Sequence, residues 1–154
     1  MKIFIGADHA GFELKQKLIP FLESLGHEVV DKGALEYDAY DDYPDYMSEV
    51  AKEISKNSDS TETRGIIIGA SGQGEAMVVN KFKNVRAMVY YGENSNASII
   101  KASRNDNDSN VFSIGARFVT DGEAMDAVKS WLETPFPKEE RHVRRIAKLN
   151  NING

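Results

Sequence analysis

The chain alternates between short apolar runs and amphipathic stretches, and this alternation constrains its fold more than any other feature. Five runs, most of them rich in β-branched residues, are bounded by glycine, asparagine or aspartate and have the length of buried strands. They are KIFI (2–5), EVVD (28–31), GIIIG (65–69), VRAMVYY (85–91) and NVFSIG (110–115). The pattern predicts five strands that alternate with helices.

Amphipathic stretches separate these runs and carry apolar residues at helical spacing. Pro20 falls inside the first stretch and is expected to kink or split that helix. A strand–helix alternation repeated five times predicts a doubly wound α/β fold, in which a five-stranded parallel sheet has right-handed crossovers and helices on both faces. The apolar positions that define the helices are Phe12, Leu18, Leu22 and Leu25, then Tyr46, Val50 and Ile54, then Ala124, Val128, Trp131 and Leu132.

The length of 154 residues is that of one ordinary domain, and no repeat or linker divides residues 1–154. The last segment, TPFPKEERHVRRIAKLNN, starts with two prolines and then becomes helical and basic. We therefore expect one domain that ends in a C-terminal helical arm, over residues 135–154, which docks elsewhere.

The composition excludes several classes of function. Nineteen basic and 24 acidic residues give a net charge of −5, which argues against nucleic acid or an anionic membrane as a general partner. The absence of cysteine excludes disulfides, thiolate catalysis and cysteine-based zinc sites, and agrees with a reducing compartment. No apolar run is long enough for a membrane span, and the N-terminal run is too short for a signal peptide. A cytoplasmic protein is expected.

Ligands of doubly wound folds bind outside the carboxyl ends of the strands. Three loops follow from this rule: GADHAG (6–11), GASGQGEA (69–76) and YYGENSNA (90–97). The second loop has the glycine spacing of a phosphate-binding P-loop, but Glu75 replaces the lysine. Gly72 and Gly74 permit a ligand to approach the backbone closely, and the helix that follows favours an anion. Glu75 either stabilises that helix N-terminus or takes part in chemistry.

Other polar residues also have two interpretations. Asp8 either caps the next helix or, together with His9, offers an acceptor and a switchable donor to a sugar or a phosphate. The three histidines lie far apart without a metal-binding spacing, which argues against a metal site. The segment DDYP (41–44) is either a helix-entry turn or places Tyr43 over a sugar. The polar segment 103–111 is interpreted as a turn before the fifth strand.

The basic residues near the C-terminus are candidates for phosphate binding. Arg141 and Arg145 lie four residues apart on one helical face, where two guanidinium groups could hold one phosphate. The alternative is a solvated face paired with Glu139 and Glu140. Arg117 follows the fifth strand and could reach the same ligand or a neighbouring subunit.

Taken in order, these segments resemble the ribose-5-phosphate isomerase B family of sugar-phosphate isomerases, which includes galactose-6-phosphate and allose-phosphate isomerases. The resemblance extends from Met1 to about Leu149 and rests on GADHAG, GALEYDAYDDYPDY, GASGQGE, the pair Asn80–Lys81, NDSNVFSIGARF and TPFPKEERHVRRI. It implies an aldose–ketose isomerase without a cofactor or metal. It also implies a homodimer or a dimer of dimers, in which the partner's C-terminal arm completes each site.

The family has one branch in which a loop cysteine moves the proton between C1 and C2 of the sugar and another in which a glutamate does so. The cysteine position is Gly69 here and Glu75 matches the glutamate, so Glu75 is implied as the base that forms a cis-enediolate. Ser71 and the backbone N–H groups around Gly72 and Gly74 would hold the oxyanion. Further substrate contacts are implied for Asp8, His9, Tyr43 and Asn107, and phosphate contacts for Arg117, Arg141 and Arg145.

One position departs from the family pattern. The family commonly has a histidine, credited with opening the furanose ring, where this chain has Asp106. An ionised aspartate is a poor general acid unless burial raises its pKa, but it can act as a base on the anomeric hydroxyl. The resemblance implies interconversion of ribose 5-phosphate and ribulose 5-phosphate, with Glu75 and Asp106 as the catalytic residues. The alternatives are an isomerase of a hexose 6-phosphate, such as allose or galactose phosphate, and a non-catalytic sugar-phosphate-binding subunit.

Overall fold

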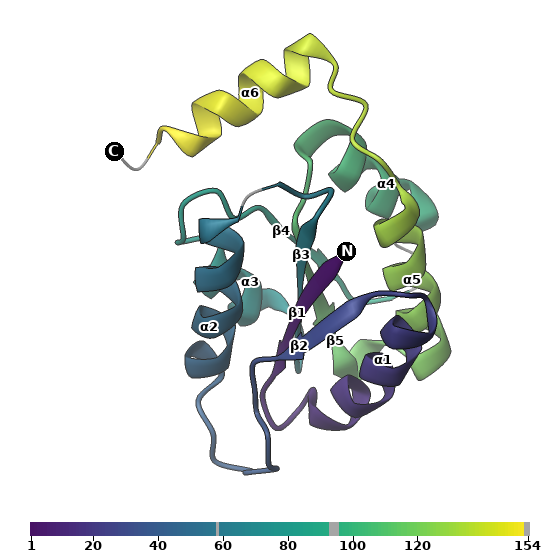
Figure 1. Ribbon diagram of the computed structural model, residues 1–154. Helices are drawn as coiled ribbons and strands as arrows, with labels where there is room; N and C mark the ends of the chain where they lie inside the picture. Colours follow the sequence, from purple (N-terminus) through teal and green to yellow (C-terminus); the bar gives the residue numbers. More distant parts are fainter. Residues whose placement is uncertain (58, 93–95, 153–154) are drawn as a thin grey trace.

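The computed structural model describes residues 1–57, 59–92 and 96–152. Within this part of the chain, five strands form one parallel sheet in the order β2-β1-β3-β5-β4, which confirms the predicted doubly wound fold (Figure 1). The strands are β1 (Lys2–Ala7), β2 (Glu28–Asp31), β3 (Thr63–Gly69), β4 (Ala87–Tyr90) and β5 (Val111–Gly115).

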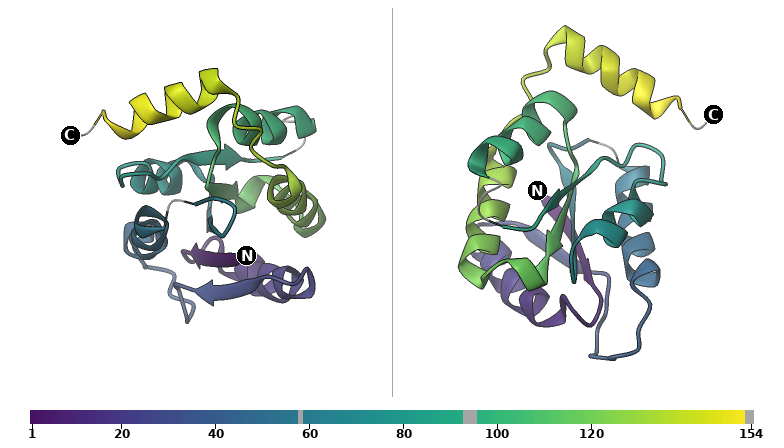
Figure 2. Two further views of the ribbon diagram at one scale, coloured as in Figure 1. Left: turned by 45° about the horizontal axis from the view of Figure 1, so that its top comes forward. Right: turned by 180° about the vertical axis from the view of Figure 1, so that it is seen from behind.

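Helices cover both faces of the sheet, with α1, α4 and α5 on one face and α2 and α3 on the other (Figures 1 and 2). Ile66 and Ile68 of β3 belong to the core under α1 and α5, whereas Ile67 belongs to the core under α2. The apolar run of β3 is therefore continuous because both of its faces are buried. The helices are α1 (Phe12–Ser24), α2 (Tyr43–Lys56), α3 (Gln73–Val79), α4 (Asn96–Asn107), α5 (Asp121–Glu133) and α6 (Glu140–Asn150).

Two local predictions differ from the structure. Of the two outcomes expected at Pro20, the split does not occur: α1 runs through Pro20, because its buried leucines lie on both sides of the proline while Pro20 itself faces solvent. Segment 103–111 is not a turn throughout, since α4 continues to Asn107 and only residues 108–110 connect it to β5. A further difference is small: β1 and β3 each extend two residues beyond the predicted runs, β1 at its carboxyl end and β3 at its amino end.

The parallel strands give the sheet two different edges. All carboxyl ends lie at the lower edge in Figure 1, together with the loop from β2 to α2, and all amino ends lie at the upper edge. Helix α4 runs back across the sheet, so its C-terminus lies at the amino edge. Among the described residues, the helices lack the combination of length and apolar character that a membrane span requires.

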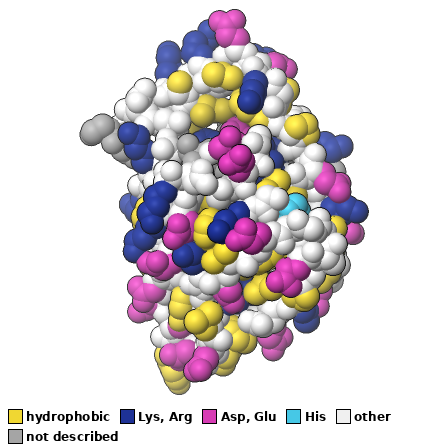
Figure 3. Space-filling model, in the orientation of Figure 1, with side chains coloured by type: hydrophobic (Ala, Val, Ile, Leu, Met, Phe, Trp, Pro, Cys, Tyr) yellow, Lys and Arg dark blue, Asp and Glu magenta, His cyan; other side chains and the backbone are white. Residues whose placement is uncertain are grey.

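Helix α6 is the predicted C-terminal arm and stands away from the rest of the molecule at the amino edge (Figures 1 and 2). His142 is its buried residue, whereas Val143, Leu149 and, just after the helix, Ile152 are exposed. Hydrophobic side chains are visible on the arm at the top of the space-filling view (Figure 3). The arm therefore presents apolar surface that the single chain leaves uncovered.

Candidate active site

The candidate site lies where β1 and β3 end side by side in the middle of the sheet. Ala7 pairs with Ile68, and Gly69 pairs with Gly115 of β5, so three strands end at nearly the same level. The chain passes from β1 to β2 on one side and later from β3 to β4, beyond β5, on the other. In doubly wound folds, such a reversal opens a ligand-binding crevice outside the carboxyl ends of the strands, here between the loops after β1 and β3.

The loop after β3 turns directly into a helix and places Glu75 in the first turn of α3. Gly72 has φ +76°, in the left-handed region that glycine adopts readily, and its carbonyl accepts a hydrogen bond from Ser113 Oγ at 2.6 Å. Ser71 Oγ accepts a hydrogen bond from the backbone N–H of Gln73 at 3.3 Å. The loop is therefore held against β5, and Glu75 is 5% exposed.

The carboxyl group of Glu75 occupies the space where a side chain of residue 69 would stand. A Cβ atom built on Gly69 would overlap the Oε1, Cδ and Cγ atoms of Glu75. Any side chain at position 69 would therefore displace this carboxylate. Glycine at position 69 therefore leaves the space that the Glu75 carboxyl group needs.

The environment of Glu75 favours its protonated form more than water does. Burial raises the pKa of Glu75, and the negative charge of Asp8 acts in the same direction, while hydrogen bonding to the backbone opposes them. Its Oε2 atom is buried and has no hydrogen-bond partner among the described residues. A carboxylate with a raised pKa beside a crevice has the properties of a general base.

Three more predicted residues lie around the same crevice. The ring of Tyr43 lies against Gly74. A Cβ atom on Gly74 would be only 3.0 Å from the Tyr43 hydroxyl oxygen. Arg117 follows β5 and donates its backbone N–H to the Ala70 carbonyl at 3.1 Å. The hydrogen bond to Asp41 raises the pKa of His9, and Arg117 lies close enough for its positive charge to oppose that rise. The structure thus places Tyr43, His9 and Arg117 at the carboxyl edge with Glu75.

Asp8 and His9 follow β1 and have different partners. Asp8 Oδ1 accepts hydrogen bonds from the backbone N–H groups of Ala10 and Gly11, at 3.0 and 3.2 Å, so it organises the turn that leads into α1. His9 Nδ1 lies 2.6 Å from Asp41 Oδ1. Ligand atoms of Asp8, His9 and Asp41 lie within 4.8 Å of one another, a grouping that could also hold a metal ion.

The remaining predicted residues lie at the opposite edge of the sheet. Asp106 and Asn107 are the last residues of α4, and Arg141 and Arg145 belong to α6. Asp106 Oδ1 lies 3.6 Å from Nε2 of the buried His142, an ion-pair distance when the imidazole is protonated. The Asp106 side chain is 53% exposed, so one chain does not bury it in the way that an acid role requires. A single chain therefore does not assemble all the predicted residues.

Arg141 and Arg145 lie on the helical arm at the predicted spacing, and both are exposed. Arg141 Nε lies 3.0 Å from Glu139 Oε2, so the surface pairing that the sequence offers as an alternative is present for this residue. The loop after β4 was the third predicted ligand loop, and residues 93–95 within it lie outside the described residues.

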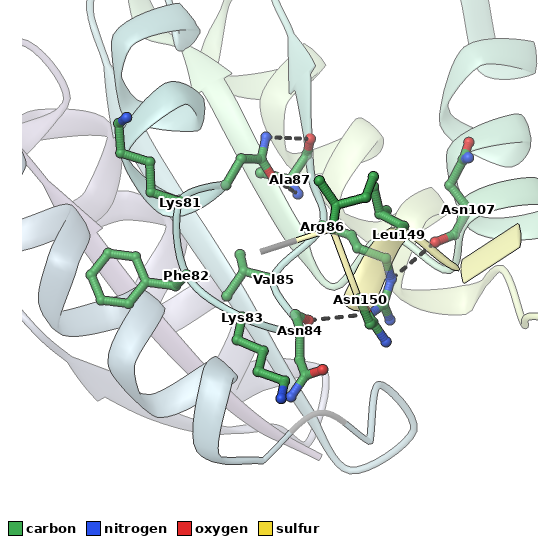
Figure 4. Close-up of a pocket in the computed structure, with 12 residues that line it drawn as sticks. Lys81, Phe82, Lys83, Asn84, Val85, Arg86, Ala87, Asn107, Leu149 and Asn150 are labelled. Carbon is green, nitrogen blue, oxygen red and sulfur yellow. Dashed lines mark hydrogen bonds between the residues drawn. The ribbon is translucent and has the colours of Figure 1, made fainter. Parts of the chain in front are cut away.

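A cavity of about 450 Å³ separates α6 from the turn between α3 and β4 (Figure 4). Arg86 crosses this region and donates hydrogen bonds to the carbonyls of Asn84 and Asn107, at 3.1 and 3.0 Å. Leu149 and Asn150 of α6 line the other side. The cavity is at the amino edge, away from Glu75. It lies between the body of the molecule and α6, which stands away from it.

Sequence reasoning did not identify the contacts of Asp41 and His142. The two consecutive aspartates before Tyr43 offered one signal: Asp42 is the N-cap position of α2, which leaves Asp41 free for another role. His142 lies within the predicted arm, but nothing in its neighbours along the chain indicates that it packs beside Asp106.

The structure is that of a doubly wound α/β protein with a buried carboxylate in a glycine loop at the carboxyl edge of its sheet. The sequence model of the family described as ribose/galactose isomerase matches residues 3–149. The chain belongs to this family.

Relatives and solved structures agree with this assignment. The chain is 39% identical to ribose-5-phosphate isomerase B of Mycobacterium tuberculosis, over 95% of this chain and 86% of the relative. The solved structure of ribose-5-phosphate isomerase B from Mycoplasma genitalium with bound ribulose-5-phosphate has a TM-score of 0.89 and 37% identity, over 97% of this chain and 93% of that one. The corresponding enzyme of Clostridium thermocellum has a TM-score of 0.88 and 36% identity, over 99% and 97% of the two chains.

Proposed function

We propose that this protein is an aldose–ketose isomerase that interconverts ribose 5-phosphate and ribulose 5-phosphate. The observation that carries the proposal is the buried carboxylate of Glu75, whose pKa is raised and whose Oε2 lacks a partner, in a glycine loop at the carboxyl edge. The relatives named ribose-5-phosphate isomerase B, one of them solved with bound ribulose-5-phosphate, support the choice of a pentose phosphate.

In the proposed mechanism, Glu75 removes the proton from C2 of the open-chain aldose and the electrons form the cis-enediolate. Glu75 then returns the proton to C1, while a proton passes from O2 to O1, so that the ketose forms without net loss of atoms. Ser71 and the backbone N–H groups of the loop stabilise the developing oxyanion, which is the term that often contributes most to such catalysis. The raised pKa makes the Glu75 carboxylate a stronger base than an exposed glutamate.

The substrate also needs groups that the carboxyl edge of one chain does not supply. The predicted phosphate ligands Arg141 and Arg145, together with Asp106 and Asn107, lie at the amino edge. We propose that a second copy brings its amino edge to the carboxyl edge of the first, in a homodimer or a dimer of dimers. The uncovered apolar residues of the arm support this assembly, because docking would bury them.

Two other functions stay open to experiment. A hexose 6-phosphate, such as allose or galactose phosphate, would need the same base and phosphate ligands, and the matching family is described as ribose/galactose isomerase. A non-catalytic sugar-phosphate-binding subunit is suggested by Asp106, which replaces a histidine. The placement of Glu75 argues against the binding role, because a buried carboxylate disfavours a phosphorylated ligand unless it has a chemical task.

Since sugar phosphates are charged metabolites and the chain has no cysteine, we place the enzyme in the cytoplasm.

The test is proton exchange followed by NMR in deuterated water. With ribose 5-phosphate, the native protein should form ribulose 5-phosphate and introduce deuterium at C1 or C2, whereas Glu75→Gln should lower turnover by at least about 1,000-fold because the base is lost. The matched control is Glu13→Gln, since Glu13 occupies the first turn of α1 as Glu75 does in α3 but is exposed. Near-native turnover by Glu75→Gln would refute the assigned base.

A comparison of substrates tests the choice of sugar. The ratio kcat/KM should be higher for ribose 5-phosphate than for allose 6-phosphate or galactose 6-phosphate. A reversed order would assign the enzyme to a hexose phosphate, and saturable binding without turnover of any of the three would leave only the binding role.

A further inference from the structure

A buried carboxylate that the proposed mechanism does not use holds His9 at the edge of the crevice. Asp41 Oδ1 lies 2.6 Å from Nδ1 of the His9 ring and accepts a second hydrogen bond, at 3.2 Å, from the backbone N–H of His9. One oxygen atom therefore fixes both the backbone and the ring of the same residue. The Asp41 side chain is 3% exposed, whereas the His9 side chain is 32% exposed.

This contact determines how the His9 ring can act. When Nδ1 donates its hydrogen to Asp41, the remaining ring nitrogen, Nε2, is available to a ligand, and no hydrogen bond occupies it among the described residues. In the neutral ring Nε2 is an acceptor, but in the protonated ring it is a donor. Only the protonated form can donate to a phosphate oxygen while it keeps the bond to Asp41.

The charges around His9 favour that form. The hydrogen bond that His9 Nδ1 donates to Asp41 raises the pKa of His9 most, and the charges of Asp8 and Asp41 act in the same direction. Partial burial of the ring and the positive charge of Arg117 oppose them. The second oxygen of Asp41, Oδ2, is buried without a hydrogen-bond partner among the described residues, so the cationic ring is the main group that compensates this carboxylate.

We propose that Asp41 is a positioning residue, which fixes the backbone and the ring of His9 through one carboxylate oxygen so that the free edge of the ring, Nε2, faces the phosphate group of the sugar. This inference rests on the proposed function for the identity of the ligand. The contact between Asp41 and His9 stands without it. Neither the family match nor the relatives assign a role to Asp41.

The first measurement concerns the pair itself. Histidine Cε1–H resonances are followed by NMR as a function of pH in the native protein, in Asp41→Asn and in Asp42→Asn, with His9→Gln identifying the His9 signal. Asparagine keeps an acceptor for the backbone N–H of His9 but removes the charge. Asp42→Asn is the matched control, because Asp42 is the next residue, is exposed and makes no capping hydrogen bond.

We expect Asp41→Asn to lower the pKa of His9 toward its ordinary value of about 6.5, and Asp42→Asn to change it little. Since a ring with that pKa is only about one-tenth protonated at pH 7.5, Asp41→Asn should weaken binding of ribose 5-phosphate by up to about tenfold at pH 7.5. At pH 5.5 the two proteins should bind almost equally. Binding is measured in the Glu75→Gln background, so that the ligand is not converted.

A double-mutant cycle separates positioning from a general structural role. In the His9→Gln background, Asp41→Asn should have no further effect on binding, because the ring through which Asp41 acts is gone. An equal loss of affinity in both backgrounds, a loss that does not depend on pH, or an unchanged pKa of His9 in Asp41→Asn would overturn the proposal. If the protein binds ribose 5-phosphate without converting it, the proposed activity fails but the cycle still decides the role of Asp41.

Discussion

Residue 69 and the carboxyl group of Glu75 compete for the same space, and this competition explains the unusual glycine loop. The loop has the backbone of an anion site, with Gly72 in a left-handed conformation, but it carries a carboxylate where a phosphate-binding loop carries a lysine. Because the Glu75 carboxyl group fills the space that a side chain of residue 69 would occupy, Gly69 is required for Glu75 to reach its position. The anion that the loop accommodates forms during the proposed reaction instead of arriving with the substrate.

Burial of Glu75 should cost stability at neutral pH. Since its pKa is raised in the folded protein, the folded state binds the proton more tightly than the unfolded chain does. The free energy of unfolding therefore falls as the pH rises from about 4.5 through the raised pKa, and stays lower above it. Glu75→Gln removes this dependence.

We accordingly expect Glu75→Gln to raise the free energy of unfolding by about 1 kcal/mol at pH 7.5, and Tm by roughly 2–4 °C, with little gain near pH 4.5. Thermal unfolding of both proteins at the two pH values provides the measurement. A stability gain of the same size at both pH values would show that the charge of Glu75 is not its cause.

At the scale of elements, buried arginines join α4, β3 and α5 at the amino edge. Arg104 and Arg86 bind the Asp108 carboxylate at 2.8 and 2.9 Å. Arg64 donates to the carbonyls of Trp131 and Leu132 near the C-terminus of α5, where the partial negative charge of the helix end favours a cation. Burial, with the charge of Arg104, lowers the pKa of Arg64 to about 10, so the group stays charged at neutral pH.

Asp108 is the carboxylate that pairs with two of these arginines, Arg86 and Arg104, and the four residues form a largely buried cluster. We expect Asp108→Asn to destabilise the protein by about 3 kcal/mol, because it leaves buried guanidinium groups without a counter-charge. Asparagine tolerates the positive φ of 46° at this position, so the effect should report the charge and not backbone strain. Urea unfolding measures the change.

The control for Asp108→Asn is Asp121→Asn, which breaks the 2.6 Å ion pair with Lys17 on the surface. Both of those side chains are about half exposed, and such pairs contribute about 0–1 kcal/mol. Equal losses of stability in the two variants would contradict the role given to the buried cluster.

At the scale of the whole molecule, the predicted catalytic and phosphate-binding residues are divided between the two edges of the sheet. Glu75 belongs to the carboxyl edge, whereas Arg141 and Arg145 belong to the arm at the amino edge. If two copies exchange these edges, each active site draws one set of residues from each chain. A chain with a defect in one set should therefore complement a chain with a defect in the other.

We expect the Glu75→Gln chain and the Arg141→Ala/Arg145→Ala chain to be almost inactive alone and to recover activity when they are co-expressed. Random assembly makes half of the dimers mixed, each with one intact site of two, so the recovery should approach about one-quarter of native activity. Turnover of ribose 5-phosphate by the purified mixture is the measurement. Mixing Glu75→Gln with His9→Gln, two defects of the same edge, is the control and should recover nothing. No recovery in the first mixture would mean that one chain supplies the whole site.

The sequence alone determined the class of fold and the location of the reactive loop. Both depend on local patterns: apolar runs with the length of strands, helical spacing between them, and glycines around an acidic residue at the end of β3. Parallel connections then require the loops after β1 and β3 to lie at one edge, which is why Asp8, His9 and Glu75 could be grouped before the structure was known.

Only the tertiary structure decided which charged groups are buried and what they contact. Asp41 meets His9 across 32 positions of the chain, and His142 packs beside Asp106, although no local pattern marks either pair. Arg104, in the last turn of α4, is likewise buried although its neighbours along the chain are polar. A short-range pattern reports backbone preference, whereas the energy of a buried charge depends on partners and solvent exclusion that exist only after the elements have packed.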